Sequence, residues 1–207
     1  MQTGDYVVHI VDDEEPVRKS LAFLLTMAGF AARVHNSATD FLAVATARGF
    51  GRACLVTDLR MPDMSGVELL EKLRAADAMV PAVVISGHGD VPMAVAAMKA
   101  GALDFIEKPF QDEVLIEAIR RAAERISDAP EKDDAAAIRA RHALLTERER
   151  QVLAAVVAGL PNKSIAYDLD ISPRTVEVHR ASVMAKMQAR SLPELVRMTL
   201  AAELAVS

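Results

Sequence analysis

Residues 53–70 read ACLVTDLRMPDMSGVELL and contain one complete strand-to-helix unit. The apolar, β-branched run at 53–58 is typical of a buried strand, and it ends on the charged residue Asp58. Ser65, followed three residues later by Glu68, is a capping pair that predicts a helix over about 65–76. The stretch therefore predicts a buried strand that carries a carboxylate to the start of a loop, with a helix after the loop.

The same alternation of short apolar strands and amphipathic helices extends outward over residues 1–127. Ser37 with Asp40 is a second capping pair, and Gly29 and Gly101 stand where helix ends favour glycine. The further strands are expected at YVVHIV, ARVHN, PAVVIS and DFIEK, and the further helices at about 14–28, 37–48, 91–100 and 112–127. Five such units predict an α/β fold with a doubly wound parallel sheet and helices on both faces.

An all-α domain is expected from residue 144 onward, where the strand signals stop. Thr146 and Glu149 form a capping pair, and Ser172 precedes a proline in the way that opens a helix. The helices are expected at 147–158, 162–168, 173–187 and after Ser191. We assign 1–127 to the first domain, 128–143 to a linker that is partly helical, and 144–207 to a four-helix domain.

Composition places the chain among ordinary globular proteins, with 52% apolar residues. No apolar run approaches the roughly 20 residues that span a bilayer, no secretory signal is visible, and Cys54 has no second cysteine to pair with. A cytoplasmic location is expected. Residues 1–127 hold 18 acids and 13 bases, whereas 146–207 hold 7 acids and 8 bases. Charge alone therefore does not indicate a nucleic-acid partner.

Polar or charged side chains end four of the five predicted strands. They are Asp12 and Asp13, Asp58, Ser86 and Lys108. Because ligands of open α/β sheets bind at the carboxyl ends of the strands, we expect these groups to converge. An all-oxygen site of this kind suits Mg²⁺, and a carboxylate can act as a nucleophile toward phosphorus. Mg²⁺ and the lysine would neutralise the charge that develops during phosphoryl transfer.

The chain resembles the receiver domains of bacterial two-component systems over about residues 5–125. The resemblance is carried by VDDEEPVRKSL, LVTDLRMPDMSGVELL, VVISGHG and DFIEKPF. It implies the strand order 2-1-3-4-5, phosphorylation of Asp58 by a histidine kinase, and a cis peptide between Lys108 and Pro109. It also implies Mg²⁺ held by Asp13, Asp58 and the carbonyl of Arg60, with Asp12 acting through water, and a switch formed by Ser86 and Phe105.

The second domain resembles the LuxR/NarL-type helix-turn-helix through LTERERQVLAAVVAGLPNKSIAYDLDISPRTVEVHRASVMAKM. The helix over 173–187 is then the recognition helix, with base contacts expected near its start and phosphate contacts further along. The expected DNA-binding residues are Asn162, Lys163, Ser164, Arg174, Thr175, Glu177, Val178, Arg180 and Lys186. Glu177 departs from the pattern, because this position is often basic in the family; its carboxylate can accept from cytosine.

Together the two resemblances identify the chain as a member of the FixJ/NarL family of response regulators. The family implies a phosphorylation-activated transcriptional activator, here of nitrogen-fixation genes, which is not itself an enzyme. The implied partners are a FixL-like, haem-containing kinase that senses oxygen, promoter DNA, RNA polymerase and a second copy of the phosphorylated chain, with no membrane. No haem is expected in the chain itself, since its five histidines are scattered and no C-x-x-C-H occurs. His9 and His35 are interpreted as ordinary strand-end residues.

Two alternatives remain open from the sequence. A phosphatase with an aspartyl-phosphate intermediate would need a second aspartate two residues after Asp58, and Arg60 stands there. An adaptor would use its helical domain to bind protein, and a gel shift with phosphorylated and unphosphorylated protein separates it from a DNA-binding regulator.

Overall fold

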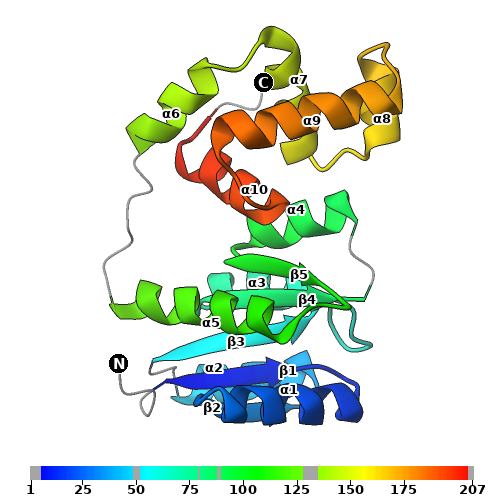
Figure 1. The fold of residues 1–207 in the computed structure, drawn as a ribbon. Helices are drawn as coiled ribbons and strands as arrows, with labels where there is room; N and C mark the ends of the chain where they lie inside the picture. The colour runs from blue at the N-terminus through cyan, green and yellow to red at the C-terminus, as the bar shows by residue number, and fades with distance from the viewer. Residues whose placement is uncertain (1–5, 49–51, 79, 88–89, 128–134, 205–207) are drawn as a thin grey trace. The chain divides into compact units, whose positions relative to one another are not determined.

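The computed structural model describes residues 6–48, 52–78, 80–87, 90–127 and 135–204 (Figure 1). The chain divides into two compact units, which are treated separately below. The first takes residues 1–89 and 100–130, and the second takes residues 90–99 and 131–207. Residues 128–134, the first part of the predicted linker, lie outside the described residues, so the predicted domain boundaries stay predictions.

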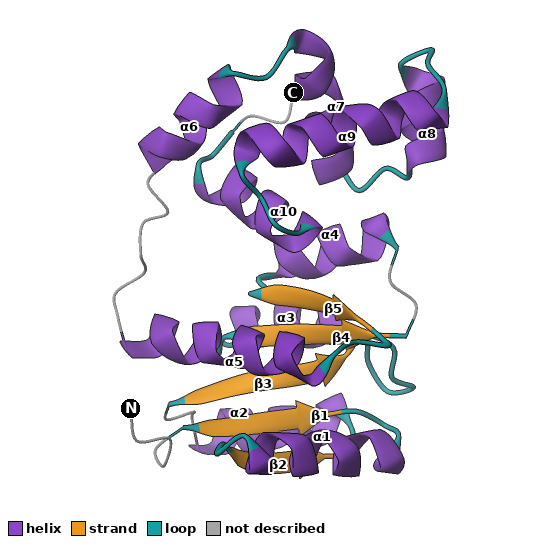
Figure 2. Ribbon diagram, viewed as in Figure 1, coloured by secondary structure: helices purple, strands orange, loops and turns teal. Residues whose placement is uncertain are grey.

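The first unit contains a five-stranded parallel sheet in the order β2-β1-β3-β4-β5 (Figure 2), which confirms the predicted fold class and strand order. The strands are β1 (Val7–Val11), β2 (Ala31–His35), β3 (Ala53–Asp58), β4 (Ala82–Ser86) and β5 (Asp104–Glu107). Every residue of β3 and β4 is buried. This is the pattern of central strands that are covered on both faces, and it explains their continuous apolar sequences.

Helices cover both faces of this sheet (Figure 1). They are α1 (Glu15–Met27), α2 (Ala38–Arg48), α3 (Gly66–Ala75) and α5 (Asp112–Ser127); α4 (Val91–Ala100) falls between β4 and β5 in the chain. Leu21 and Leu25 of α1 and Leu115 and Ile119 of α5 share one apolar core with residues of the strands. Each predicted helix lies within one residue of its observed bounds, because the capping residues mark the ends.

The predicted caps are present. Ser65 and Glu68 form a reciprocal capping box at the start of α3, and the Ser37 hydroxyl accepts from the Asp40 N–H at 3.0 Å. Gly29 and Gly101 have φ values of 89° and 106°, the left-handed region that favours glycine at helix ends.

Besides most of α4, the second unit contains the four predicted helices and also α6 (Ala135–Ala143). The four are α7 (Glu147–Val157), α8 (Asn162–Asp168), α9 (Pro173–Met187) and α10 (Leu192–Ala201). Although α6 lies in the segment that we interpreted as a linker, it packs against α9 and α10. Ile138 is buried, and the guanidinium of Arg139 donates to the carbonyl of Ala202 at 3.3 Å. These contacts make α6 a structural part of the helical unit.

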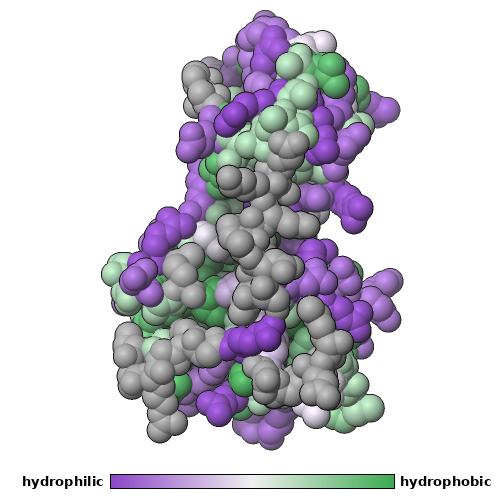
Figure 3. All heavy atoms as spheres, turned by 90° about the vertical axis from the view of Figure 1, so that its left-hand side faces the viewer, coloured by the Kyte–Doolittle hydropathy of each residue, from purple (hydrophilic) through white to green (hydrophobic). Residues whose placement is uncertain are grey.

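Hydrophilic side chains cover much of the face drawn in Figure 3, with apolar side chains between them. Within the described ranges, no helix combines the length and the apolar composition that crossing a membrane requires.

Candidate phosphoacceptor site and nucleic-acid interface

Lys108 joins two buried carboxylates at the carboxyl edge of the sheet. Its ammonium lies 2.8 Å from Oδ1 of Asp58 and 3.2 Å from Oδ2 of Asp12. Asp58 is the last residue of β3, Asp12 follows β1 and Lys108 follows β5, so three parallel strands deliver the three groups to one place. Asp12 is 1% exposed and Asp58 is 9% exposed. The predicted convergence of these residues is present in the structure.

The backbone around Lys108 fixes the position of its side chain. The Lys108 N–H donates to the carbonyl of Ser86 at 2.7 Å, and the Lys108–Pro109 peptide is cis, as the resemblance implied. Asp12 accepts a backbone hydrogen bond from Glu14 at 2.8 Å. Both the cation and its buried partner are therefore held by the main chain.

Burial and charge act on this site in opposite directions. Burial raises the pKa of Asp12, and the neighbouring Asp58 raises it further against the lowering effects of Lys108 and the Glu14 N–H. Burial alone would lower the pKa of Lys108, but Asp58 and Asp12 raise it above its ordinary value. Lys108 is consequently charged at neutral pH, and one positive charge faces two carboxylates.

The other predicted site residues take different places. Arg60 is exposed, but its backbone N–H donates to Oδ2 of Asp58 at 2.7 Å. Ser86 is buried at the end of β4, and Phe105 is half-buried on β5. Asp13 is exposed to solvent. Within the described residues, no three histidine, cysteine, aspartate or glutamate side chains gather closely enough to hold a metal ion.

Oxygen donors suited to Mg²⁺ are nevertheless present. Mg²⁺ usually keeps several water ligands and needs only one or two carboxylates from the protein. Asp58 and the buried Asp12 leave one negative charge uncompensated by Lys108, and Asp13 is the next residue in the chain after Asp12. The donor set is all-oxygen and net negative, so these residues fit a hard divalent cation.

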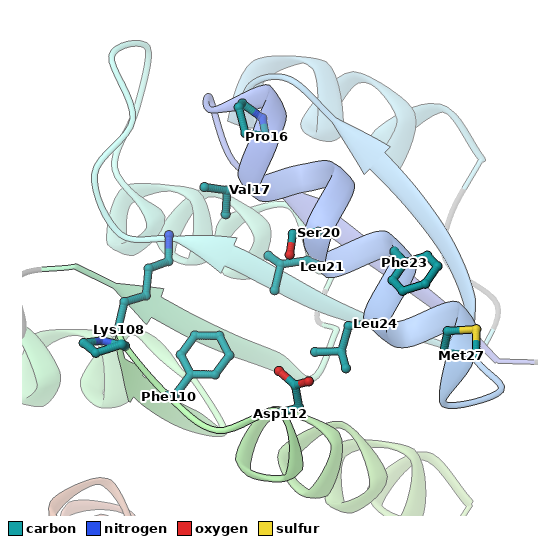
Figure 4. Close-up of a pocket in the computed structure, with 11 residues that line it drawn as sticks. Pro16, Val17, Ser20, Leu21, Phe23, Leu24, Met27, Lys108, Phe110 and Asp112 are labelled. Atoms are coloured by element: carbon teal, nitrogen blue, oxygen red, sulfur yellow. The ribbon is translucent and has the colours of Figure 1, made fainter.

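A groove runs along α1 beside this site (Figure 4). Its volume is about 620 Å³, and one end is bounded by Lys108. The α1 side chains Phe23 and Met27 at its border are 70% and 72% exposed, which is unusual for such large apolar residues. The groove is lined by Pro16, Val17, Ser20, Leu21, Phe23, Leu24, Met27, Lys108, Pro109, Phe110 and Asp112.

A buried histidine pair lies on β1 and β2, where we expected ordinary strand-end residues. Nδ1 of His9 is 2.9 Å from Nε2 of His35, and the rings are stacked with centroids 5.2 Å apart. His9 lies in the middle of β1, not at its end, and burial lowers its pKa to about 4. The two histidines lie on different strands, and no local sequence pattern indicates that they meet. Their pairing therefore follows only from the register of β1 and β2 in the structure.

In the helical unit, α9 presents one face to the core and the opposite face to solvent. Val176, Val183 and Met187 are buried. The exposed face carries the side chains at positions i, i+3, i+4 and i+7, namely Arg174, Glu177, Val178 and Ala181. The Ser172 hydroxyl caps the helix by accepting from the Thr175 N–H at 3.0 Å. A short helix, a tight turn and this half-exposed helix are the parts of a helix-turn-helix.

Three of the expected DNA contacts, Asn162, Arg180 and Lys186, are engaged within the protein. Lys186 donates to Oε2 of the buried Glu149 at 2.6 Å, so its ammonium joins α9 to α7. Arg180 donates to Oδ1 of Asn162 at 2.6 Å and thereby joins α9 to the start of α8. Among the remaining expected contacts, Lys163 is exposed and Ser164 and Thr175 are partly exposed.

Family models also divide the chain into two parts, but they place residues 90–99 in the first part. Residues 8–120 match the family model of the response regulator receiver domain, and residues 143–199 match that of the bacterial regulatory proteins of the luxR family.

Individual proteins resemble the chain over nearly its whole length. It is 71% identical over 198 residues to the transcriptional regulatory protein FixJ of Rhizobium meliloti, covering 95% of this chain and 96% of the relative. Full-length FixJ from B. japonicum is a solved structure with 46% identity, a TM-score of 0.57 and coverage of 98% and 99%. The beryllofluoride-activated NtrC4 receiver domain dimer has 33% identity and a TM-score of 0.53, covering 57% of this chain and 97% of the NtrC4 chain.

Proposed function

This chain belongs to the FixJ-type response regulators, transcriptional regulators with a receiver domain and a LuxR-type DNA-binding domain, and we propose that phosphorylation of Asp58 activates it. The observation that carries the proposal is the position of Lys108, within 2.8 Å of Asp58 and 3.2 Å of Asp12. An acyl phosphate on Asp58 would carry about two negative charges in place of the single charge of the carboxylate, at a place where a cation is already held.

The proposed reaction forms one bond and breaks one. An oxygen of Asp58 attacks the phosphorus of a phosphohistidine, the P–N bond breaks, and the imidazole leaves with the electron pair. Lys108 then pairs with the phosphoryl oxygens, and the Arg60 N–H keeps the second Asp58 oxygen in place. Asp13, Asp58, the Arg60 carbonyl and Asp12 through water would hold Mg²⁺, which when bound neutralises charge on the transferred group.

Ser86 and Phe105 form the proposed switch. The Ser86 hydroxyl at the end of β4 would move toward the phosphoryl group, and the half-buried Phe105 ring would turn into the space it leaves. β5 is an edge strand of the sheet, so a change at Phe105 reaches the surface of the receiver. We infer that this surface pairs two copies of the chain. The NtrC4 receiver, a dimer when activated by beryllofluoride, supports this inference.

Dimerisation would place two copies of α9 on DNA half-sites about one helical turn apart. The exposed face with Arg174, Glu177 and Val178 fits base readout, with Thr175 at its edge. Lys163, Ser164, Asn162 and Arg180 suit phosphate contacts near the start of α8. We assign Lys186 primarily to the fold, because Glu149 holds its ammonium.

The proposed phosphodonor is a sensor histidine kinase. A donor histidine must come within bonding distance of Asp58, so its carrier must dock beside Lys108. The groove extends from there along α1 toward the exposed Phe23 and Met27, which provide an apolar surface at its other end (Figure 4). We propose a FixL-like, oxygen-sensing kinase as the donor, because the relatives are named FixJ. We further propose that the chain is a cytoplasmic activator of nitrogen-fixation genes and works with RNA polymerase.

Intact-mass spectrometry tests the assignment. Acetyl phosphate with Mg²⁺ should add one phosphoryl group to the wild-type chain and none to Asp58→Asn. Labelling that persists in Asp58→Asn would reject Asp58 as the acceptor. Phosphate release that continues through many turnovers would favour the phosphatase alternative, and a phosphorylated protein that shifts no duplex DNA would favour the adaptor.

A further inference from the structure

The loop that follows Asp58 is closed tightly at its base. The Gly66 N–H donates to the carbonyl of Leu59 at 2.9 Å, and the Leu59 N–H donates to the carbonyl of Ile85 at 2.9 Å. A Cβ at position 66 would lie 2.6 Å from the carbonyl oxygen of Asp58, so only glycine fits there. These contacts fix the two ends of the loop, but they do not reach the residues between them.

The tip of the loop is attached to a different helix. Oδ2 of Asp63 accepts from the Thr39 N–H at 2.9 Å and from the Thr39 hydroxyl at 2.8 Å. We call this pair of hydrogen bonds the Asp63–Thr39 clasp. Thr39 lies in the first turn of α2, where N–H groups have no partner within the helix. Burial alone would raise the pKa of Asp63, but the hydrogen bonds from Thr39 lower it, so the carboxylate is charged at neutral pH.

Arg60 lies between the fixed base and the clasped tip. Its N–H donates to Asp58 at 2.7 Å, and its carbonyl is the proposed backbone ligand of the divalent cation. A backbone carbonyl cannot change its position by rotating a side chain. Its distance from the cation therefore depends on the conformation of the loop that carries it.

We propose that Asp63 is a positioning residue: its clasp on Thr39 holds the Arg60 backbone in place beside Asp58 and so sets the affinity of the site for a divalent cation. The inference rests on the proposed function of Asp58. Groups that orient metal ligands without touching the metal typically change affinity by about 10- to 100-fold when removed. The clasp also ties the start of α2 to the phosphoacceptor loop.

The alternative is that Asp63 merely caps α2. The chain offers a matched control, because the Ser37 hydroxyl caps the same helix by accepting from the Asp40 N–H at 3.0 Å, a hydrogen bond that does not involve the loop. Ser37→Ala should loosen the start of α2 as Asp63→Ala does. Only Asp63→Ala should also free the loop.

Mn²⁺ binding to the full-length protein, measured by electron paramagnetic resonance, tests the proposal without relying on phosphorylation. We expect Asp63→Ala to weaken Mn²⁺ binding about tenfold, Thr39→Val to weaken it less, and Ser37→Ala and Thr39→Ser to leave it unchanged. The acetyl-phosphate reaction should need correspondingly more Mg²⁺ in the first two variants and reach the same maximal rate.

Equal Mn²⁺ affinity in Asp63→Ala, Thr39→Val and wild type would overturn the proposal, as would an equal loss in Asp63→Ala and Ser37→Ala. If Asp63→Ala does not fold, Thr39→Val decides, because it removes one hydroxyl hydrogen bond and keeps the shape. A wild-type chain that neither binds Mn²⁺ nor accepts a phosphoryl group would instead contradict the proposed function itself. If only the proposal about the Asp63–Thr39 clasp is wrong, the wild-type chain still binds Mn²⁺ and still accepts a phosphoryl group.

Discussion

Glu149 is the most consequential single charge in the helical unit, and its removal gives a prediction whose size follows from the structure. The residue is 5% exposed, and its carboxylate joins α7 and the N-cap of that helix to α9. It accepts from Lys186 at 2.6 Å, from the Ser182 hydroxyl at 2.5 Å and from the Thr146 N–H at 2.7 Å. In Glu149→Gln the negative charge that pairs with Lys186 is lost, and one of the two oxygens becomes an NH₂ group, which cannot accept a hydrogen bond.

The perturbed pKa of Glu149 sets the expected magnitude. The hydrogen bonds from Lys186, Ser182 and Thr146 lower its pKa from 4.5 to about 2. That difference corresponds to about 3 kcal/mol of stability for the folded helical unit. Lys186 is 34% exposed, and solvent weakens the ion pair, so we expect a loss of about 2 kcal/mol in Glu149→Gln at neutral pH.

The pH dependence has a defined sign. Because the folded pKa lies below the unfolded one, the stabilisation is complete above pH 4.5 and disappears as the pH falls through about 2. The stability difference between wild type and Glu149→Gln should therefore shrink in the same interval.

Amide hydrogen exchange of peptides from α7 and α9 measures this stability in the full-length protein. Glu147→Gln is the matched control, because Glu147 lies on the same helix with its side chain 74% exposed and only a surface pair with Arg150; it should cost less than about 0.5 kcal/mol. Protection in Glu149→Gln equal to that in Glu147→Gln would refute the reasoning. A stability difference between Glu149→Gln and the wild type that persists at the lowest pH would also refute it.

Three further predictions concern the other charged groups. Arg174→Ala should change the sequence preference on DNA and cost about 1–3 kcal/mol of binding free energy at one base pair. Arg180→Ala should weaken binding to all duplexes alike and reduce the dependence of affinity on salt concentration. Competition binding at several salt concentrations measures both, and identical effects of the two substitutions would contradict the distinction. His9 has a pKa lowered to about 4, so its contribution to stability is complete above the unfolded value of 6.5 and is lost as the pH falls toward 4. The free energy of unfolding of His9→Gln, measured with urea, should accordingly depend less on pH between 4 and 6.5 than that of the wild type. The same pH dependence in both proteins would exclude His9 as its cause. Lys108→Met should abolish response to beryllofluoride while the chain stays folded, as judged by circular dichroism, and a normal response would remove Lys108 from the mechanism.

The architecture and the phosphoacceptor site could be predicted from local sequence patterns. Each strand of the sheet is a short apolar run, and capping residues mark the starts of α2, α3, α7, α9 and α10. Asp12, Asp58 and Lys108 come at strand ends that parallel pairing brings to one edge. Topology alone therefore places these side chains near one another.

Pairings between distant residues could not be predicted in this way. Glu149 and Lys186 are 37 residues apart, Arg180 and Asn162 are 18 apart, and Asp63 and Thr39 are 24 apart. A lysine or arginine on a recognition helix has the same sequence pattern whether it faces phosphate or a buried carboxylate, and only the packing of α7 and α8 against α9 distinguishes the two. The packing of α6 could not be predicted for the same reason, since the burial of Ile138 depends on distant residues of the helical unit.

Sedimentation velocity of the full-length protein with Mg²⁺, in the presence and absence of beryllofluoride, tests most directly whether modification at Asp58 controls assembly for DNA binding. We predict a monomer that becomes a dimer when beryllofluoride is added, and an Asp58→Asn variant that stays monomeric under both conditions. A wild-type chain that remains monomeric at saturating beryllofluoride while binding its operator tightly would contradict the account, as would an Asp58→Asn variant that dimerises in response to it.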